Sequence, residues 1–401
     1  MIVALVLATG CQTDRSSPPP PAATEAQLAT PAVPSPTPVT SQPSEPAPQF
    51  SRWERVTMPD AAPDEYGGGL PNDVIRFGST YVAVGGVNGG CCTGAFSETT
   101  RGLVWTSTDG TAWQLVPDQP SLALGRLVEV ATDGARLVAV GTFLTPSARY
   151  PGSAQPVPAA WTSIDGISWE LLDGAPPLSS IAASEAGWVG AVNATDELGM
   201  RLLEVGAAIW TSADGLTWNV LAGPDELGTG EIRSVALDAS GRIAAAGGDA
   251  DRRSLWIGTL AAGIERRVAV SDLSTLTQAA WIDGQSVAAG LNSRGAGALL
   301  LPSGETTWAA VDLPGAGANV RDILDGSDGL LATGSVGPGG SVGAAWWMPA
   351  GGTGTLLSDG LSDVAGEVFA AVMSDEAAIA VGTGWDAASA HAVPIAWFAP
   401  R

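Results

Sequence analysis

The sequence contains no lysine, one histidine and three cysteines among its 401 residues. All 18 basic residues are therefore arginine, against 41 acidic residues, and the formal net charge is -23. A strongly acidic protein is repelled by phosphate backbones, so the composition argues against a nucleic-acid partner. The missing lysine is typical of a GC-rich genome and gives no information about mechanism.

The scarcity of histidine and cysteine also limits metal and nucleophile chemistry. His391 has no clustered Cys or His partner, so it indicates neither a metal site nor a Ser-His-Asp triad. Two acidic pairs, Asp249 with Asp251 and Asp325 with Asp328, lack a full calcium-loop pattern, and we interpret them as solvated turn carboxylates. We expect no metal and no cofactor.

The first eleven residues, MIVALVLATGC, form a short apolar run that ends in small residues and a cysteine. Such a run is too short to span a bilayer as a helix, which needs about 20 residues. The pattern Ala8-Thr9-Gly10-Cys11 resembles a bacterial lipobox, although the usual basic residues before the run are absent. We predict a lipoprotein signal and lipobox over 1–11, with lipidation at Cys11; a generic signal peptide with a chance cysteine is the alternative.

Residues 12–49 are rich in proline, serine, threonine and alanine, with almost no large apolar side chain. A segment of this kind cannot bury enough surface to offset its ordering entropy. We predict a disordered spacer over 12–49 that holds the following domain away from a membrane surface.

Residues 50–401 contain a repeated unit. Seven copies each show a first strand, a second strand that ends near glycine, a loop and a third strand with a large apolar anchor. The anchors are Trp105, Trp161, Trp210, Trp256, Leu300, Trp346 and Trp397, and neighbours lie 44 to 56 residues apart. A period near fifty, made of short strands and turns, predicts an all-β fold of the β-propeller type.

An eleven-residue phrase recurs in the first three repeats: LVWTSTDGTAW, AAWTSIDGISW and AIWTSADGLTW. Asp-Gly between apolar and aromatic residues is a strong hairpin signal, because glycine accepts positive φ and aspartate accepts hydrogen bonds from nearby backbone N–H groups. We predict turn formation rather than catalysis at the hairpin between strands three and four. The residues concerned are Ser107, Asp109, Gly110, Trp113, Ser163, Asp165, Gly166, Trp169, Ser212, Asp214, Gly215 and Trp218.

This phrase resembles the Asp-box, or BNR repeat, of sialidase-type propellers, with one residue fewer between the aspartate and the tryptophan. In that family the boxes are structural and lie away from the active site. The resemblance implies a bacterial propeller lipoprotein, and a sialidase would also need a Tyr–Glu pair and three arginines. The sequence offers only Tyr66, Tyr81 and Tyr150, and the arginine motif that opens a sialidase domain is not recognisable.

The two ends of the repeat region predict the number of blades. The seventh repeat stops without a fourth strand, while Trp53-Glu54-Arg55-Val56 matches the fourth strands that begin at Trp113 and Trp169. The N-terminal strand can therefore complete the last sheet, which removes exposed edges. We predict a seven-bladed propeller closed by this strand.

Two further features are candidates for function. Adjacent Cys91 and Cys92 predict a strained vicinal disulfide in an oxidising compartment, with free thiols or intermolecular pairing as the alternatives. Long loops between strands two and three, and arginines near the first strands, suggest binding on the face that also carries the four-to-one connections, mainly over blades one to three. The candidate binding residues are Arg101, Arg126, Tyr150, Arg201, Arg233 and Arg321.

We therefore expect a monomeric lipoprotein of the cell envelope, anchored on the outer side of the cytoplasmic membrane. Its propeller is expected to be a non-catalytic binding or scaffold module for a protein or glycan partner. A sialidase-like glycoside hydrolase is the alternative.

Overall fold

The computed structural model describes residues 50, 52–61, 68–87, 100–146, 154–192, 207–228, 231–248, 252–304, 307–326, 328–350, 354–386 and 391–401. The chain divides into two units, Met1–Glu45 and Pro46–Arg401. The predicted signal, the lipobox with Cys11 and the spacer over 12–49 lie outside the described residues. Within the part described, no helix is long and apolar enough to cross a membrane.

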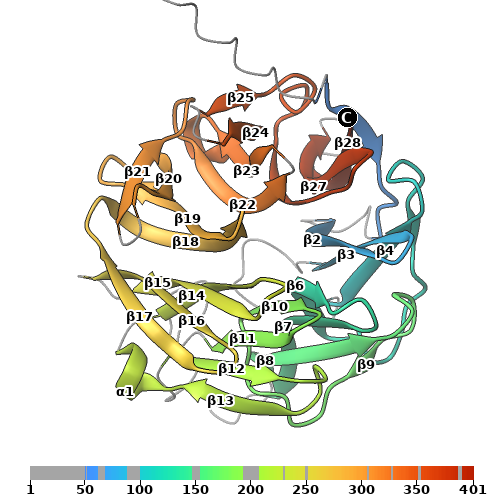
Figure 1. Ribbon diagram of the computed structural model, residues 1–401. Helices are drawn as coiled ribbons and strands as arrows, with labels where there is room; N and C mark the ends of the chain where they lie inside the picture. The colour runs from blue at the N-terminus through green and yellow to red at the C-terminus, as the bar shows by residue number, and fades with distance from the viewer. Residues whose placement is uncertain are drawn as a thin grey trace, which may run out of the picture. The chain divides into compact units, whose positions relative to one another are not determined.

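Residues from 50 onward form seven four-stranded antiparallel sheets arranged as a β-propeller (Figure 1). The predicted fold class is therefore confirmed. The first three blades contain β2 (Gly69–Phe77), β3 (Thr80–Val87), β4 (Gly102–Ser107) and β5 (Gln114–Leu115); β6 (Gly125–Thr132), β7 (Leu137–Pro146), β8 (Ala154–Ser163) and β9 (Glu170–Leu171); and β10 (Ser180–Ser184), β11 (Gly187–Val192), β12 (Ala208–Ser212) and β13 (Trp218–Ala222).

Blades four to six contain β14 (Glu231–Leu237), β15 (Arg242–Gly248), β16 (Arg253–Thr259) and β17 (Gly263–Val270); β18 (Leu273–Ile282), β19 (Gln285–Asn292), β20 (Gly297–Pro302) and β21 (Trp308–Asp312); and β22 (Asn319–Gly326), β23 (Gly329–Val336), β24 (Val342–Pro349) and β25 (Thr355–Leu357). Blade seven contains β26 (Gly366–Met373), β27 (Ala377–Asp386), β28 (His391–Pro400) and β1 (Glu54–Thr57). Two short helices, α1 (Pro224–Leu227) and a 3₁₀ turn at Pro338–Gly340, lie in connections.

The first strand of each blade is the inner strand, because each of the seven packs against the inner strands of its two neighbours. The seven anchors predicted from the repeat all lie on third strands. Each pairs with a small residue of the second strand, as Trp105 does with Ala83 and Trp346 with Ala332. The small partners leave room for the large anchors, which pack between neighbouring sheets.

The ring is closed by the N-terminal strand, as predicted (Figure 1). Arg55 of β1 pairs with the anchor Trp397 of β28, just as Leu115 pairs with Trp105 in blade one. Trp53, immediately before β1, is buried against Phe50 and Trp347. The first and last described strands therefore share one sheet, and blade seven has four strands like the other six blades.

The Asp-Gly hairpins connect third and fourth strands through one repeated set of hydrogen bonds. In blade one, Asp109 Oδ1 accepts from the backbone N–H groups of Thr111 (2.8 Å) and Ala112 (2.7 Å). The Ser107 hydroxyl accepts from Gly110 N–H at 2.9 Å, where φ is +75°. The hairpins at Asp165 and Asp214 repeat these bonds.

The tryptophans that follow these hairpins have different surroundings. Trp113 and Trp169 are buried, and their indole N–H groups donate to Gly110 O (3.0 Å) and Gly166 O (3.3 Å). Trp218 is only half-buried. In all three blades the aspartate carboxylate accepts hydrogen bonds from backbone N–H groups of its own turn.

His391 is the first residue of β28. Its side chain is almost fully buried, and its Nε2 lies 3.1 Å from Asp60 Oδ2. The two residues are 331 positions apart, so ring closure is what brings them together.

Candidate functional site

The inner strands carry β-bulges that set which side chains face the central channel. Six of the seven inner strands shift register with their second strands, for example between Pro71 and Asp73 in β2; β10 shows no such shift. In these six blades the residue after the bulge occupies an equivalent place, and Ser180 occupies the same place in β10 without a bulge. We call these residues the channel ring: Asp73, Glu129, Ser180, Ser234, Gln278, Asp322 and Ala370.

The channel ring joins neighbouring blades by hydrogen bonds. Asp73 Oδ2 accepts from Val130 N–H at 2.8 Å, and Asp322 Oδ2 accepts from Ala371 N–H at 3.0 Å. The hydroxyls of Ser180 and Ser234 accept from Val235 N–H (3.1 Å) and Ala279 N–H (3.2 Å), and Ser180 also donates to Glu129 at 3.3 Å. Side chains of one inner strand thus satisfy backbone donors of the next inner strand, which a bulge would otherwise leave unpaired.

The three carboxyl groups of the channel ring have unusual ionisation. Burial raises the pKa of Asp73 to about 7, assisted by the nearby charge of Asp322 and opposed by the N–H groups of Val130 and Val74. Burial also raises the pKa of Glu129 well above its ordinary value, with the charge of Asp73 as the next cause. The pKa of Asp322 is raised by burial, against hydrogen bonds from Ala371 and Ile323. Because like charges share a poorly solvated channel, ionising one carboxyl disfavours ionising the next.

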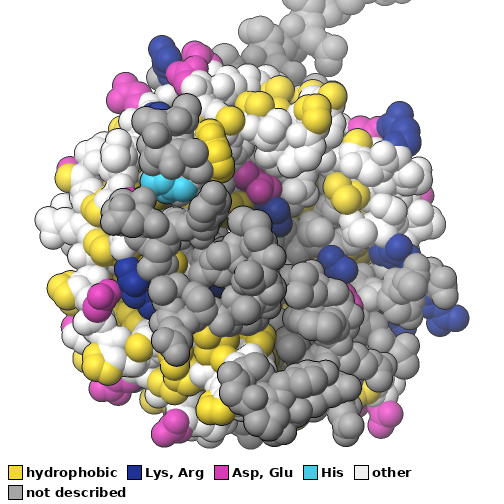
Figure 2. Space-filling model, turned by 180° about the vertical axis from the view of Figure 1, so that it is seen from behind, with side chains coloured by type: hydrophobic (Ala, Val, Ile, Leu, Met, Phe, Trp, Pro, Cys, Tyr) yellow, Lys and Arg dark blue, Asp and Glu magenta, His cyan; other side chains and the backbone are white. Residues whose placement is uncertain are grey.

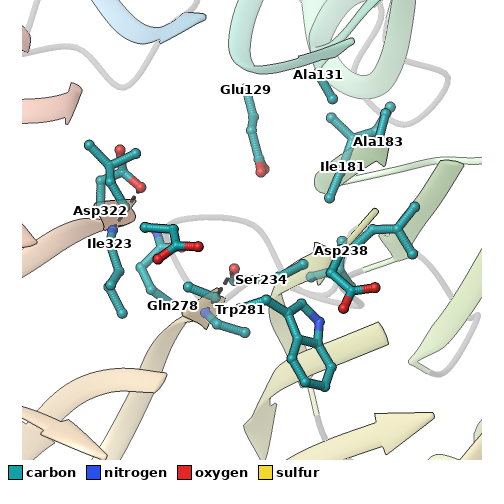
Figure 3. Close-up of a pocket in the computed structure, with 18 of the residues that line it drawn as sticks. Glu129, Ala131, Ile181, Ala183, Ser234, Asp238, Gln278, Trp281, Asp322 and Ile323 are labelled. Carbon is teal, nitrogen blue, oxygen red and sulfur yellow. Dashed lines mark hydrogen bonds between the residues drawn. The ribbon is translucent and has the colours of Figure 1, made fainter. Parts of the chain in front are cut away.

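A cavity of about 660 Å³ occupies one end of the channel. Its walls are the second halves of inner strands together with the turns between strands one and two. In Figure 3, Glu129 extends into this cavity, with Asp322 on one side and Asp238 on the other. The larger cavity therefore opens on the face of the one-to-two turns, opposite the face on which the sequence placed binding.

An ion pair between Arg242 and Asp238 lies at the rim of this larger cavity. The Arg242 guanidinium bonds Asp238 Oδ2 (Nε to Oδ2, 2.6 Å) and lies 4.5 Å from the centre of the Trp281 ring. Burial opposes ionisation of Asp238, but hydrogen bonds from Arg242 N–H, the Ser240 hydroxyl and the Arg242 guanidinium hold its pKa below the usual value. The arginine is therefore neutralised and stacked, rather than available for a ligand.

A second cavity, of about 570 Å³, lies on the opposite face among blades five, six and seven. It is lined by connections between strands two and three and between strands four and one, with Arg321 and Glu367 at its polar wall. In the space-filling view, acidic and basic side chains lie next to each other near the middle of one face (Figure 2).

The structure separates the arginines that the sequence proposed as a binding group. Arg126, Arg233 and Arg321 lie on the inner strands of blades two, four and six, and only Arg321 lines either of the two cavities. Arg233 pairs with Glu231 at 3.2 Å. Arg101 donates from Nη2 to Ala61 O at 2.6 Å, so it ties blade one to the preceding segment.

Tyr150, Arg201, Cys91 and Cys92 lie outside the described residues, and so do Asp249 and Asp251. Their predicted roles stay predictions. Among the described residues, no group of three or more His, Cys, Asp or Glu side chains is placed to hold a metal ion.

The sequence reasoning missed the channel ring, although a signal for the bulges was present. Opposite the bulge, the second strand carries glycine, as at Gly85, Gly141 and Gly334, because a Cβ there would lie about 2 Å from a carbonyl oxygen of the inner strand. Blade three has Val192 at this place and shows no bulge. These glycines of the second strands thus mark where the inner strand bends toward its partner.

No family model and no curated protein matches the chain. Solved structures do resemble it in fold. Virginiamycin B lyase from Staphylococcus aureus has a TM-score of 0.56 at 6% identity, over 87% of this chain and 99% of that one. Sqt1 from Saccharomyces cerevisiae has a TM-score of 0.50 at 10% identity, over 88% of this chain and 100% of that one.

A sialidase from Trypanosoma rangeli, in a mutant form that displays trans-sialidase activity, has a TM-score of 0.47 at 13% identity, over 88% of this chain. The chain spans only 58% of the length of that sialidase. At these identities the likenesses to virginiamycin B lyase and Sqt1 show a shared fold and assign no activity.

Proposed function

We propose that the protein is a non-catalytic binding module of the cell envelope, anchored through Cys11 on the outer side of the cytoplasmic membrane, with a protein or glycan as its partner. The lipobox pattern and the proline-rich spacer over 12–49 support the anchor. The observation that carries the binding role is how the channel carboxyls are used. Asp73 and Asp322 each have both oxygens engaged by backbone N–H groups.

This engagement matters because the channel carboxyls have raised pKa values and would be first candidates for catalysis. A catalytic carboxylate turns an oxygen toward its substrate. The hydrogen bonds of Asp73 and Asp322 instead turn both oxygens toward backbone N–H groups of the inner strands. The propeller is then a stiff frame whose cavities and loops recognise a partner.

The alternative, a sialidase-like glycoside hydrolase, has one observation in its favour. Glu129 extends into the larger cavity with a raised pKa, as a general acid that protonates a leaving group would require. The second carboxylate that such chemistry needs would come from Asp238, Asp322 or Asp325, which also line this cavity. Tyr81, a potential nucleophile, is buried in blade one and unavailable to a substrate in the channel.

Two measurements on the purified full chain test the proposal. We expect no turnover on a broad panel of fluorogenic glycosides, and retention of the chain on sedimented envelope polysaccharide or on its protein fraction. Turnover that disappears in the Glu129→Gln variant would replace the binding role by the hydrolase role. Failure to bind either envelope fraction would remove the support for a binding role.

A further inference from the structure

The smaller cavity has a polar wall built from two neighbouring inner strands. Arg321 is the bulge residue of β22, and Glu367 lies near the start of β26 in the next blade. Arg321 Nε donates to Glu367 Oε1 at 2.7 Å. The same oxygen accepts from Ser335 Oγ at 3.2 Å and from Asn319 Nδ2 at 3.4 Å. Three donors therefore fix the orientation of one carboxylate oxygen.

The other polar atoms of this pair are not used inside the protein. Within the described residues, the two Nη groups of Arg321 and Oε2 of Glu367 have no hydrogen-bond partner. The Arg321 side chain is 48% exposed, and its guanidinium carbon lies 6.0 Å from the centre of the Phe369 ring. The cavity wall thus presents donors and one acceptor next to each other on side chains whose positions are already set.

The rest of the cavity wall is built mainly from small residues. Gly317 and Gly340 have φ of +66° and +71°, and a Cβ on them would lie 2.7 Å from Gly337 O and 2.8 Å from Ser335 Oγ. The glycines allow two loops to meet at the rim without side chains that would fill the space. Leu291 and Pro338 are the largest apolar side chains in the lining.

We propose that this cavity binds a neutral, hydroxyl-rich unit such as a sugar ring. One hydroxyl accepts a hydrogen bond from an Arg321 Nη group, and its neighbour on the ring donates to Glu367 Oε2. This inference rests on the proposed binding function and names a ligand class for it. The volume of about 570 Å³ suits a sugar unit or two.

Charge and shape argue against other ligands. A carboxylate or phosphate would face the Glu367 carboxylate, and a cation would face the Arg321 guanidinium, so neither charged ligand gains from the pair as a whole. A peptide amide also offers a donor and an acceptor, but protein partners gain most of their affinity from large apolar or aromatic anchors in deep pockets. Glycine and alanine dominate this lining and provide no such anchor site.

The chain contains a matched control for Arg321. Arg233 occupies the same bulge position in β14, its side chain is also 48% exposed, and it pairs with Glu231 at 3.2 Å. It does not line the smaller cavity. Replacing either arginine by methionine removes an inner-strand guanidinium with similar exposure, but only one of the two changes alters the proposed site.

The test is the binding of glucose, galactose, mannose and N-acetylglucosamine to the full chain, with affinities measured by saturation-transfer NMR. Inorganic phosphate, N-acetylneuraminate and a capped alanine dipeptide serve as the charged and peptide probes. We expect at least one neutral sugar to bind with millimolar affinity, weakened roughly tenfold by Arg321→Met and by Glu367→Gln, since each removes a ligand hydrogen bond. Arg233→Met should leave the affinity within about twofold.

Several outcomes would overturn the inference: no neutral sugar binds, the affinity survives both pocket variants, or phosphate, N-acetylneuraminate or the dipeptide binds more tightly. Circular dichroism establishes that each variant is folded, and two chemically different variants keep the test valid if one of them unfolds. If the full chain is retained on envelope material but binds none of the sugars, this inference is wrong and the proposed function is unaffected.

Discussion

The aspartates of the hairpins illustrate how one side chain can determine a local structure. Two hydrogen bonds from backbone N–H groups, those of Ala112 and Thr111, lower the pKa of Asp109 to about 2. Since the carboxylate satisfies donors that the turn leaves unpaired, it stabilises the hairpin most when ionised.

We predict that Asp109→Ala lowers the free energy of unfolding by about 1 kcal/mol near neutral pH, through loss of these hydrogen bonds. The folded pKa is depressed, so the stabilisation is present above the unfolded value of 3.8 and is lost as pH falls through about 2. Urea denaturation of both proteins between acid and neutral pH measures this. A difference that persists unchanged at the most acidic pH would contradict the assignment.

The pKa of Asp73 is shifted in the opposite direction, upward. Its folded pKa of about 7 lies above the unfolded value of 3.8, so the folded chain binds more protons than the unfolded chain between those values. Stability from this group is fully present below about pH 4 and declines as pH rises toward 7.

We therefore predict that Asp73→Asn costs more stability at pH 5 than at pH 8, because the amide cannot titrate and cannot supply both acceptors. The measurement is the free energy of unfolding of wild type and variant at the two pH values. A larger cost at pH 8 would mean that Asp73 is held as an anion in the folded chain.

At the scale of the element, the bulge of an inner strand depends on the glycine that faces it on the second strand. The bulge brings a carbonyl of the inner strand against the second strand, and glycine at that place makes the approach feasible. In blade two, a Cβ added at Gly141 would lie 1.9 Å from Arg126 O. The backbone rather than a flexible side chain is the obstacle, so relaxation must move the inner strand itself.

We predict that Gly141→Ala lowers the free energy of unfolding by about 3 kcal/mol, at the upper end of the cost of overpacking. Gly223→Ala is a suitable control, since the added Cβ would meet only Glu226 Oε2, at 3.7 Å. Thermal melts of both variants provide the comparison. Equal melting temperatures would show that the bulge adapts without cost.

At the scale of the whole molecule, the closure of the ring links residues from opposite ends of the repeat region. β1 supplies the fourth strand of blade seven, and Phe50 and Trp53 fill the apolar space beside Trp347. A propeller without this strand would expose the edge of β28 and a hydrophobic surface.

We predict that a chain lacking residues 1–58 aggregates or melts far below the full chain, whereas a chain lacking only 1–48 melts nearly as the full chain does. The second truncation keeps Phe50, Trp53 and all of β1. Calorimetry with light scattering distinguishes the two cases. Equal stability of the truncated chains would show that β1 contributes nothing to closure.

Much of this architecture can be predicted from the sequence, because it depends on local patterns. Each Asp-Gly hairpin, each third-strand anchor and the Trp53-Glu54-Arg55 motif is a short local pattern that can be compared from repeat to repeat. The geometry of each is set by turn chemistry and by alternation along a strand. The number of blades and the closure then follow from counting.

The channel ring, the two cavities and the Arg321–Glu367 pair were decided only by the tertiary structure. Asp73 and Val130, or Arg321 and Glu367, lie about one repeat apart in the chain and meet because inner strands of neighbouring blades converge on one axis. A single bulge changes which side chain faces that axis, and the raised pKa of Asp73 arises from burial there. Convergence and desolvation are properties of the closed ring, so no pattern within one repeat contains them.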